Sequence, residues 1–411
     1  MMSKKVPELR FKGFTDDWEQ RKLGEVGNTF TGLSGKTKED FGHGEGKFIT
    51  YVNVFNNPVA DLDGLESVEI DNKQFQVKAG DVLFTTSSET PEEVGMSSMW
   101  LGNADNIFLN SFCFGYRPTI EFDNYYLAFM LRSASIRKKF QLLAQGISRY
   151  NISKNKVMEM SIPVPSIEEQ QKIGAFFKQL DDTIALYQRK LDLLKEQKKG
   201  FLQKMFPKNG AKVPELRFKG FTDDWEERKL GESSDVRDGT HASPKYVSQG
   251  HPMVTSKNLT HFGLDMTDVS FLTDKDFNEI NKRSKVSIGD ILFGMIGTIG
   301  NPVIVDRDDF AIKNVALIKE KTSNPITNKW LLQYLKSPSF NRFIQKENAG
   351  GTQKFISLGL IRDMKLRVPE FDEQQKIGAF FKQLDDTIAL HQRKLDLLKE
   401  QKKGFLQKMF V

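Results

Sequence analysis

Few residues in this chain have the type and spacing that catalysis or metal binding requires. The five histidines are scattered, and His241, His251 and His261 recur at ten-residue intervals that fit no zinc-binding pattern. We expect them to be surface residues. The single cysteine, Cys113, excludes an internal disulfide framework and any cysteine-rich zinc or iron–sulfur site. The sequence therefore predicts neither a metal site nor a thiol-based active site.

Motifs of hydrolytic and nucleotide-binding enzymes are also missing from the sequence. It has no G-x-S-x-G nucleophile turn and no Walker A motif. The glycine-rich run 294–300 lies between apolar segments, which favours a tight hairpin over a phosphate-binding loop. Asp81 and Asp290 lack the additional carboxylates that a two-metal nuclease needs. This pattern indicates a binding protein without catalytic residues of its own.

Composition sets the class of protein. The chain has 411 residues, of which 38% are hydrophobic and 28% charged, enough for two or three folded domains. No apolar run of about 18 residues exists and no apolar core follows Met1, so we expect neither a membrane span nor a secretory signal. With one cysteine, this predicts a cytoplasmic protein. The formal net charge of +6 permits a nucleic-acid partner without requiring one.

The chain consists of two tandem halves. Residues 6–25 return as 213–232 with one difference, Gln20 against Glu227, and residues 169–206 return as 373–410 with one difference, Tyr187 against His391. The segments between these matches have diverged almost completely. Near-identical flanks indicate one type of partner met twice, and divergent interiors indicate two different ligands. Recombination through shared DNA, or two unrelated enzymatic domains on one scaffold, are the alternatives.

Each repeated segment 169–206 and 373–410 is predicted to be one long helix, with Ser166 as the N-cap of the first. Apolar residues recur at alternating spacings of four and three, the period of a coiled coil. Two such seams in one chain favour antiparallel pairing with each other over packing of each helix on its own block. Lys198 and Lys402 fall on the seam and are expected near frayed helix ends, because a buried unpaired ammonium is costly. The seam comprises Ile173, Phe177, Leu180, Ile184, Leu191 and Leu194, and Ile377, Phe381, Leu384, Ile388, Leu395 and Leu398.

The two divergent blocks are predicted to share one mixed α/β fold. A G-D-V-L-F strand at 80–84 matches G-D-I-L-F at 289–293, and Asn53 aligns with Asn258. Residues 124–137 and 328–342 are each predicted to form a helix. Because the loops differ most, they are expected to carry the residues that recognise a ligand.

The whole chain resembles the specificity subunits of type I restriction–modification enzymes. The resemblance rests on "ELRFKGFTDDWEQRKLGE" opening each half, on "LNSFCFGYRP" at 109–118, on "GTIGNPVIV" at 297–305, and on the doubled "EQQKIGAFFKQLDDTI" helix. It implies α/β target-recognition domains at 1–168 and 207–372, separated by conserved spacer helices at 169–206 and 373–411 that form an antiparallel coiled coil.

The same resemblance implies a function and a set of partners. Each recognition domain reads one half of a bipartite double-stranded DNA site, and the helices set an unread gap between the halves. The conserved regions recruit two methyltransferase subunits, and two motor–nuclease subunits join them. S-adenosylmethionine, ATP and Mg²⁺ are expected on those partners, and this chain is expected to bind no cofactor and to catalyse no reaction. A duplicated nuclease or modification enzyme, and a coiled-coil scaffold that binds protein, are the rival hypotheses.

Candidate DNA contacts follow from the chemistry of base edges, where Arg and Lys read guanine and Asn and Gln read adenine. The strongest candidates are the segments 256–258 and 353–354, which lie in loops that differ between the matching blocks. The candidates are Asn53, Thr85, Ser87, Ser88, Arg149, Tyr150 and Lys154 in the first block, and His241, Lys245, Ser256, Lys257, Asn258, Thr298, Gln353 and Lys354 in the second.

Aromatic residues recur identically in the segment that precedes each block. We interpret them, with the helix ends, as equivalent docking surfaces for two methyltransferase subunits, and core packing is the rival interpretation. They are Phe11, Phe14 and Trp18, and Phe218, Phe221 and Trp225.

Overall fold

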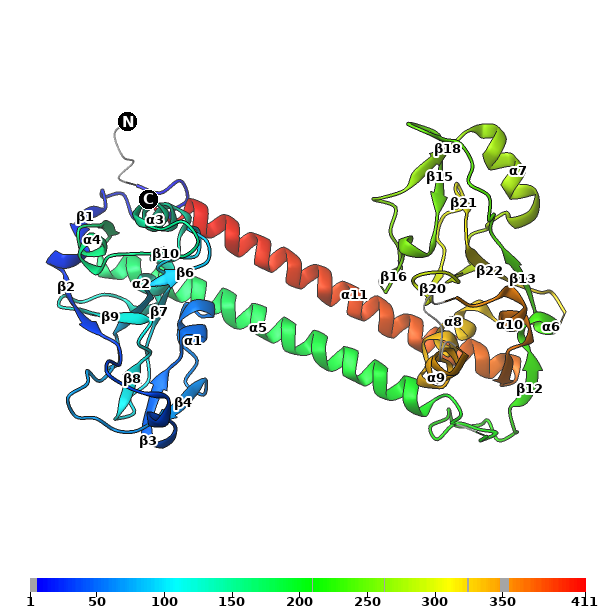
Figure 1. The fold of residues 1–411 in the computed structure, drawn as a ribbon, viewed down its shortest axis with the longest axis horizontal. Helices are drawn as coiled ribbons and strands as arrows, with labels where there is room; N and C mark the ends of the chain where they lie inside the picture. Colours follow the sequence, from blue (N-terminus) through cyan, green and yellow to red (C-terminus); the bar gives the residue numbers. More distant parts are fainter. Residues whose placement is uncertain (1–5, 209, 262, 324, 348–354) are drawn as a thin grey trace. The chain divides into compact units, whose positions relative to one another are not determined.

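The computed structural model describes residues 6–208, 210–261, 263–323, 325–347 and 355–411. The chain divides into two compact units, Met1–Gln188 with Arg393–Val411 (unit 1) and Arg189–Gln392 (unit 2). Two long helices, α5 (Ile167–Lys204) and α11 (Phe371–Lys408), each contribute to both units (Figure 1). The sequence predicted them at 169–206 and 373–410, and each observed helix begins and ends two residues before its predicted segment.

Unit 1 is built on a four-stranded sheet of order β2-β9-β5-β7 and a three-stranded sheet of order β4-β3-β8. β5 is buried along its whole length, which suits its run of apolar residues. Besides the long helices, its elements are β1 (Glu19–Lys22), η1 (Leu23–Glu25), β2 (Gly27–Thr31), η2 (Lys38–Asp40), β3 (Phe41–Ile49), α1 (Tyr51–Asn56), β4 (Leu65–Val68), β5 (Val82–Thr85), β6 (Ser87–Ser88), β7 (Ser97–Met99), β8 (Ile107–Leu109), β9 (Cys113–Pro118), α2 (Asn124–Met130), α3 (Ala134–Leu143), β10 (Tyr150–Asn151), α4 (Lys154–Met158) and β11 (Ser161–Val164).

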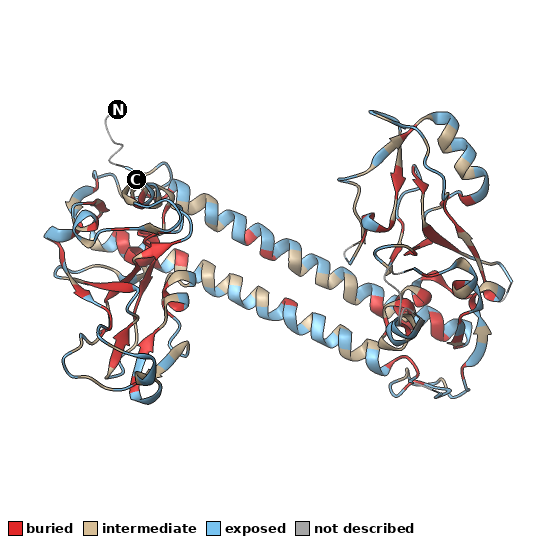
Figure 2. Cartoon of the chain, viewed as in Figure 1, coloured by how far each residue is buried: buried red, intermediate tan, exposed pale blue. Residues whose placement is uncertain are grey.

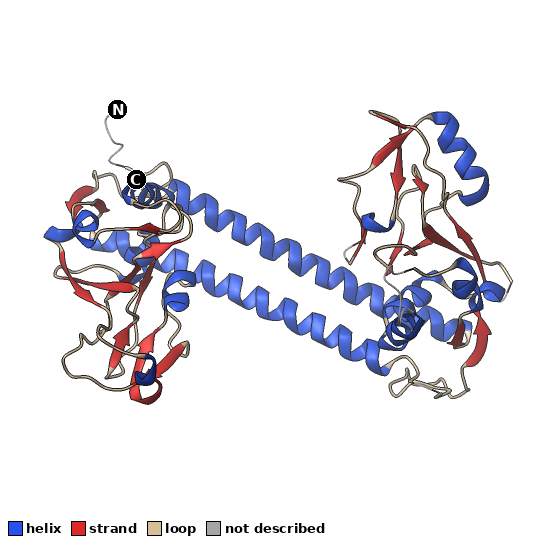
Figure 3. Ribbon diagram, in the orientation of Figure 1, coloured by secondary structure: helices blue, strands red, loops and turns tan. Residues whose placement is uncertain are grey.

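Unit 2 repeats this topology with a different sequence (Figure 3). Its main sheet has the order β13-β22-β19-β20, and β15 pairs in parallel with β21 as β3 does with β8. Its elements are β12 (Glu226–Lys229), α6 (Leu230–Ser233), β13 (Ser234–Asp238), β14 (Tyr246–Val247), β15 (His251–Val254), η3 (Ser256–Asn258), β16 (Leu259–Thr260), β17 (Gly263–Leu264), β18 (Ser270–Leu272), α7 (Asp274–Ser284), β19 (Ile291–Gly294), β20 (Gly300–Ile304), β21 (Ala311–Ile312), β22 (Val315–Glu320), α8 (Asn328–Lys336), α9 (Pro338–Glu347), α10 (Leu358–Asp363) and β23 (Lys365–Val368).

Two local predictions can be judged at once. The glycine-rich run 294–300 is the turn of the β19–β20 hairpin, with Gly294 opposite Gly300, as expected. The single helices predicted at 124–137 and 328–342 were wrong, because each is two short helices, α2 with α3 and α8 with α9. Ser133 precedes α3, and Pro338 opens α9, where its missing N–H costs no hydrogen bond.

The long helices pair antiparallel within each unit. In unit 1 the ring of Phe176 on α5 meets Phe405 on α11, with centroids 5.0 Å apart. In unit 2 Phe201 on α5 meets Phe380 on α11 at the same distance, so in both units a residue late in one helix meets a residue early in the other. The predicted seam faces inward: Ile173, Phe177, Leu191, Ile377, Phe381, Leu395 and Leu398 are buried, and Leu180, Ile184, Leu194, Leu384 and Ile388 are half-buried.

The seam lysines do not lie at frayed ends. Lys198 pairs with Asp385 at 2.5 Å in unit 2, and Lys402 pairs with Asp181 at 2.5 Å in unit 1. Each ammonium is thus balanced by a carboxylate from the opposite helix, which offsets the cost of its partial burial. The expectation of frayed ends was wrong, and ion pairing is the reason that lysine is accommodated.

A buried carboxylate on each long helix explains why two distant segments are both preserved in the repeat. Glu169, at the start of α5, accepts two hydrogen bonds from Arg10 (2.7 and 2.8 Å) and one from Trp18 Nε1 (3.0 Å). Glu373 of α11 accepts the same three bonds from Arg217 and Trp225. The conserved opening segment and the conserved helix are therefore two parts of one clamp.

The ends of the long helices complete the cores of the units. Met409 and Phe410 are buried in the core of unit 1, where Phe410 stacks 5.5 Å from Phe177. Met205 and Phe206 occupy the matching place in unit 2. Buried residues accordingly concentrate in the sheets and on the terminal turns of both long helices (Figure 2).

Candidate nucleic-acid interface

The loop between α3 and β10 in unit 1 is closed at its base and exposed at its tip. Gln145 and Asn151 exchange two backbone hydrogen bonds, of 2.9 and 2.8 Å. Gly146 has a φ of 145°, and a Cβ added there would lie 2.0 Å from the Arg149 carbonyl oxygen, so the turn requires glycine. The tip residues 147–149 are exposed. The loop can therefore present side chains to a ligand from a fixed backbone.

Three of the predicted contact residues lie on or just after this tip. Arg149 is exposed, whereas Tyr150 and Lys154 are half-buried. Tyr150 lies in β10 opposite Ser88 of β6, which anchors the loop to the main body of the unit. Of the three, Arg149 has the exposure and the donor geometry that a guanine edge or a phosphate requires.

The hydroxyl residues predicted in the same block have a structural role. Thr85, Ser87 and Ser88 are all buried. The hydroxyl of Thr85 accepts a hydrogen bond from the Met96 backbone N–H (3.0 Å), and the hydroxyl of Ser88 donates to Glu93 (3.2 Å). Their side chains hold the strands that support the exposed loop and are not presented to a DNA surface.

Asn53 and Asn258, which the alignment of the two blocks superposed, perform the same internal task. Asn53 Nδ2 donates to two carbonyls of the segment 61–64, each at 2.9 Å, and its Oδ1 accepts a backbone N–H from the same segment. Asn258 Nδ2 donates to two carbonyls of the segment 265–268 at 3.1 and 2.9 Å. Both are buried, so their amides shape a turn and are not available to an adenine edge.

His241 is the centre of a polar cluster on unit 2. Its Nε2 lies 2.8 Å from Asp238, and its Nδ1 lies 2.8 Å from Asn314 Oδ1. The hydrogen bonds to Asp238 and then to Asn314 raise the pKa of His241, while burial opposes the shift. Arg283 forms an ion pair with the same aspartate. These contacts favour the protonated form of the ring, and an imidazolium suits a phosphate better than a base edge.

The other predicted residues of the second block differ in exposure. Lys245, Lys257 and Thr298 are exposed, and Lys257 forms an ion pair with Asp268 at 2.9 Å. Ser256 is buried and its hydroxyl donates to a backbone carbonyl, so it does not face a ligand.

Gln353 and Lys354 lie outside the described residues. The residue that follows them, Phe355, forms an antiparallel bridge with Ile296 beside the β19–β20 hairpin. In unit 1 β10 pairs with β6 at the matching point. The prediction that Gln353 and Lys354 contact DNA therefore stays a prediction.

The tryptophans proposed for partner docking are core residues. Trp18 is 2% exposed and Trp225 1%, and each donates its indole N–H to the buried carboxylate described above. Their predicted docking role was wrong, because a side chain enclosed on all sides has no face left for a partner. Phe11 and Phe218 are half-buried and pack against rings of the long helices.

Two members of the same set remain at the surface. Phe14 and Phe221 are half-buried, and each ring has a lysine of the adjoining long helix over it. The Lys172 ammonium lies 4.8 Å from the Phe14 centroid, and the Lys376 ammonium lies 4.7 Å from that of Phe221. This cation–π contact repeats unchanged in the two units.

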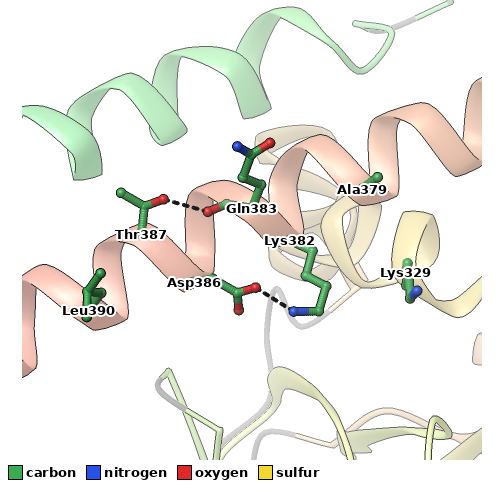
Figure 4. A pocket seen from close by; sticks show the side chains of 7 residues that line it. All are labelled: Lys329, Ala379, Lys382, Gln383, Asp386, Thr387 and Leu390. Atoms are coloured by element: carbon green, nitrogen blue, oxygen red, sulfur yellow. Dashed lines mark hydrogen bonds and ion pairs between the residues drawn. The ribbon is translucent and has the colours of Figure 1, made fainter.

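A groove continues from Phe221 along α11 in unit 2. Its first part, of about 450 Å³, is bordered by Phe221 and Lys376 and shares Ala379 with a second part of about 360 Å³ (Figure 4). The second part is lined by Lys329, Ala379, Lys382, Gln383, Asp386, Thr387 and Leu390. The Lys382–Asp386 ion pair in its lining recurs in unit 1 as Lys178–Asp182, so the helix surface is duplicated.

Comparison with known proteins places these features in a family. The family model for the type I restriction modification DNA specificity domain matches twice, at residues 15–196 and 222–400. The chain belongs to this family. Each unit thus carries one specificity domain, and each match runs from the opening segment through the block into the conserved helix.

Individual relatives agree along nearly the whole chain. The putative type I restriction enzyme MjaX specificity subunit of Methanocaldococcus jannaschii is 23% identical over 408 residues, covering 95% of this chain and 92% of that protein. The MjaVIII specificity subunit of the same organism is 23% identical over 357 residues, covering 84% and 82%. The crystal structure of a type I restriction–modification S subunit from M. genitalium matches with a TM-score of 0.63 at 17% identity, covering 99% of both chains. A second structure, from work on assembly and conformational transition of the type I system, matches with a TM-score of 0.55 at 19% identity, covering 95% and 96%.

The specificity domains also contain buried ion pairs that the sequence did not reveal. Asp81, from the G-D-V-L-F motif, is buried and accepts two hydrogen bonds of 2.7 Å from Arg117 on β9. In the second domain Asp290 pairs with Lys319 on β22. The aspartate that recurs in both halves thus ties the start of the central strand to its neighbour. Its pairing partner could not be found without knowing the strand order.

The described ranges contain no cluster of potential metal ligands. Within them, no three His, Cys, Asp or Glu side chains gather closely enough to hold a metal ion. No helix in the part of the chain that the structure describes is long and apolar enough to cross a membrane.

Proposed function

We propose that this chain reads a bipartite double-stranded DNA site, one half with each specificity domain. The observation that carries the proposal is the placement of divergent exposed segments on two frames with the same strand order. These segments include the loop of Arg149 in unit 1 and the short helix η3 with Lys257 in unit 2. Because the two domains share one frame, they should dock on DNA in the same way. Because their loops differ, they should read different half-sites. Arg149 is the leading candidate for a base contact, and His241 for a phosphate contact.

The proposal includes partners that supply the chemistry. Two methyltransferase subunits dock on the duplicated helix surfaces, two motor–nuclease subunits join them, and S-adenosylmethionine, ATP and Mg²⁺ act on those partners in the cytoplasm. The chain itself contributes recognition and catalyses no reaction. Support for the stoichiometry comes from the repetition of the Phe14–Lys172 contact as Phe221–Lys376.

One experiment tests the function. Methylome sequencing of a host that expresses this chain with its methyltransferase subunits should reveal a single motif of two short specified parts separated by a fixed unspecified gap. A continuous motif, or none, contradicts the proposal. Cleavage and methylation assays on the chain alone, with Mg²⁺ and with or without S-adenosylmethionine, should show no activity. Absence of salt-dependent binding to mixed DNA would favour the scaffold hypothesis.

The docking surfaces can be tested with the leucines that border them. Leu390 lines the groove of unit 2 and is 59% exposed, and Leu186 is its counterpart on α5. Leu186→Glu with Leu390→Glu should weaken assembly with the methyltransferase subunits roughly 100-fold or more, because an apolar contact is lost and a charge is buried. The chain should stay folded, since neither side chain is in a core. Leu142→Glu, on an exposed leucine of α3, is the matched control, and normal assembly of the double variant would contradict the docking role.

The continuous helices are proposed to set the length of the unread gap. Four residues inserted after Gln188 in α5 and after Gln392 in α11 lengthen each helix by about 6 Å and turn it by about 40° beyond a full turn. A base pair advances DNA by about 3.4 Å and turns it by about 35°. Methylation mapping should therefore show a gap wider by one or two base pairs with both half-sites unchanged. An unchanged gap would show that the helices do not set it.

A further inference from the structure

Basic side chains gather around one aspartate in unit 2. Asp385 of α11 pairs with Lys198 of α5 at 2.5 Å and accepts a hydrogen bond from Gln333 Nε2 of α8 at 3.2 Å. Lys336 lies one turn beyond Gln333 on the same helix, and Lys195 lies one turn before Lys198. Lys195 and Lys336 thus each lie one helical turn from a residue that contacts this carboxylate.

The turn between β16 and β17 adds a fourth basic group. His261 lies in this turn and experiences the charges of Lys336, Lys198, Asp385 and Lys195. Burial lowers the pKa of His261, and the lysines lower it further. The local balance is therefore positive even with the imidazole neutral.

Lys336 is the member of the group whose charge is least compensated. Its side chain is only partly exposed. Burial lowers the pKa of Lys336, the neighbouring Lys198 lowers it further, and Asp385 opposes the shift. Among the residues that the structure describes, its ammonium has no hydrogen-bond or ion-pair partner. A partly buried cation in this state is costly unless an anion completes it.

At the equivalent position in unit 1, the cation Arg132 is satisfied by hydrogen bonds within the protein. Arg132, which precedes Lys336 by the repeat offset of 204 residues, donates to the carbonyls of Ser97 (2.6 Å) and of three residues in the range 54–57 (2.8–3.0 Å). Three of these carbonyls lie at the C-terminal end of α1. At the matching place unit 2 has the three-residue turn η3, so the acceptors that satisfy the arginine have no counterpart there.

We propose that Lys336, together with Lys195, Lys198 and His261, binds one phosphate of the DNA backbone beside the half-site read by unit 2. The inference rests on the proposed function and adds a contact to it. A phosphate brings the negative charge and the acceptor oxygens that the Lys336 ammonium lacks, and lysine binds it as a point charge. Within the cluster, His261 lies four residues after Lys257, an exposed candidate for DNA contact at η3, which favours the DNA backbone over a free anion. Unit 1 makes no matching contact, so one flank of the gap is held more tightly than the other.

Charge removal at this site should change the salt dependence of DNA binding. In the full chain, Lys336→Gln should bind the target duplex roughly tenfold more weakly at low salt, and the plot of log affinity against log salt should become shallower by about 0.9. Lys336→Arg should retain binding, and Lys346→Gln, which removes an exposed lysine of α9, should leave both quantities unchanged. The circular dichroism spectrum of Lys336→Gln should match that of the parent, because no protein contact is lost.

Duplexes that carry one neutral methylphosphonate each locate the contact. One position beside the unit 2 half-site should weaken the parent about tenfold and should not weaken Lys336→Gln further. The inference would be overturned if every methylphosphonate weakened Lys336→Gln as much as it weakens the parent, or if the salt slope were unchanged. Sequence-specific binding by the parent would still support the proposed function in that case. Inorganic phosphate could instead inhibit DNA binding by the parent but not by Lys336→Gln, with no effect of any methylphosphonate. That result would identify a free-anion site and would also overturn the inference. A parent chain that binds no duplex overturns both proposals.

Discussion

Phe410→Ala is expected to lower the free energy of unfolding of unit 1 by about 3–5 kcal/mol, although the residue lies more than two hundred positions from most of that unit. Its ring is buried among Phe177 and Tyr126, at centroid distances of 5.5 and 5.9 Å, and the cavity left by alanine has no side chain to fill it. The backbone nearby is also fixed, because Leu9 N–H donates to the Lys408 carbonyl at 2.9 Å. A loss of this size exceeds half the stability of a marginal domain.

The repeat supplies a matched variant for this prediction. Phe206→Ala removes the same ring from the core of unit 2, where Phe206 stacks on Phe381. Hydrogen exchange followed by mass spectrometry should show increased exchange in unit 1 for Phe410→Ala and in unit 2 for Phe206→Ala. Lys403→Ala, at an exposed site of α11, should change neither. If Phe410→Ala loosened unit 2 alone, the assignment of the final helix turn to unit 1 would be wrong.

The architecture was predictable because it rests on patterns that survive in one dimension. The repeat defines the two halves, and the spacing from Ile173 to Leu194 defines a buried helix face. The alignment of Asn53 with Asn258 indicated one fold, and the structure gives both amides the same turn-forming bonds.

The roles of individual residues were less predictable, because they depend on what lies opposite. The tryptophan at position 18 recurs in the second half, and it would do so whether it docks a partner or fills a core. The hydrogen bond of 3.0 Å from the Trp18 indole N–H to the Glu169 carboxylate decides for the core. From the sequence alone, burial of Lys198 on the seam is expected to be costly, because the sequence does not show that Asp385 lies opposite it on the other helix. Burial of Thr85 and Ser87 depends on strand order, which polar residue types do not reveal.

Exchange of the first block is expected to change one half-site completely and leave the other intact. Residues 26–166 of this chain would be replaced by the corresponding block of a relative, while the opening segment and α5 are kept. The clamp between Arg10, Trp18 and Glu169 lies outside the exchanged residues, so the new block meets the same support. Loops such as that carrying Arg149 are inside it, and with them the base contacts of that half-site.

Two controls belong with this exchange. The donor block must keep apolar residues at the positions of Tyr126 and Met130, which pack in the core of unit 1 with Ile173 and Phe177 of α5. A reciprocal exchange of residues 233–370 should change the other half-site alone. The gap should stay constant in both chimaeras, because the inserted blocks do not alter the length of either long helix.

Methylome sequencing of a host that expresses the first chimaera with the methyltransferase subunits is the most direct test that two independent readers share one chain. The account predicts a motif whose first half is that of the donor, whose second half is that of the parent, and whose gap is unchanged. A motif altered in both halves, or one that keeps the parental first half, would contradict it.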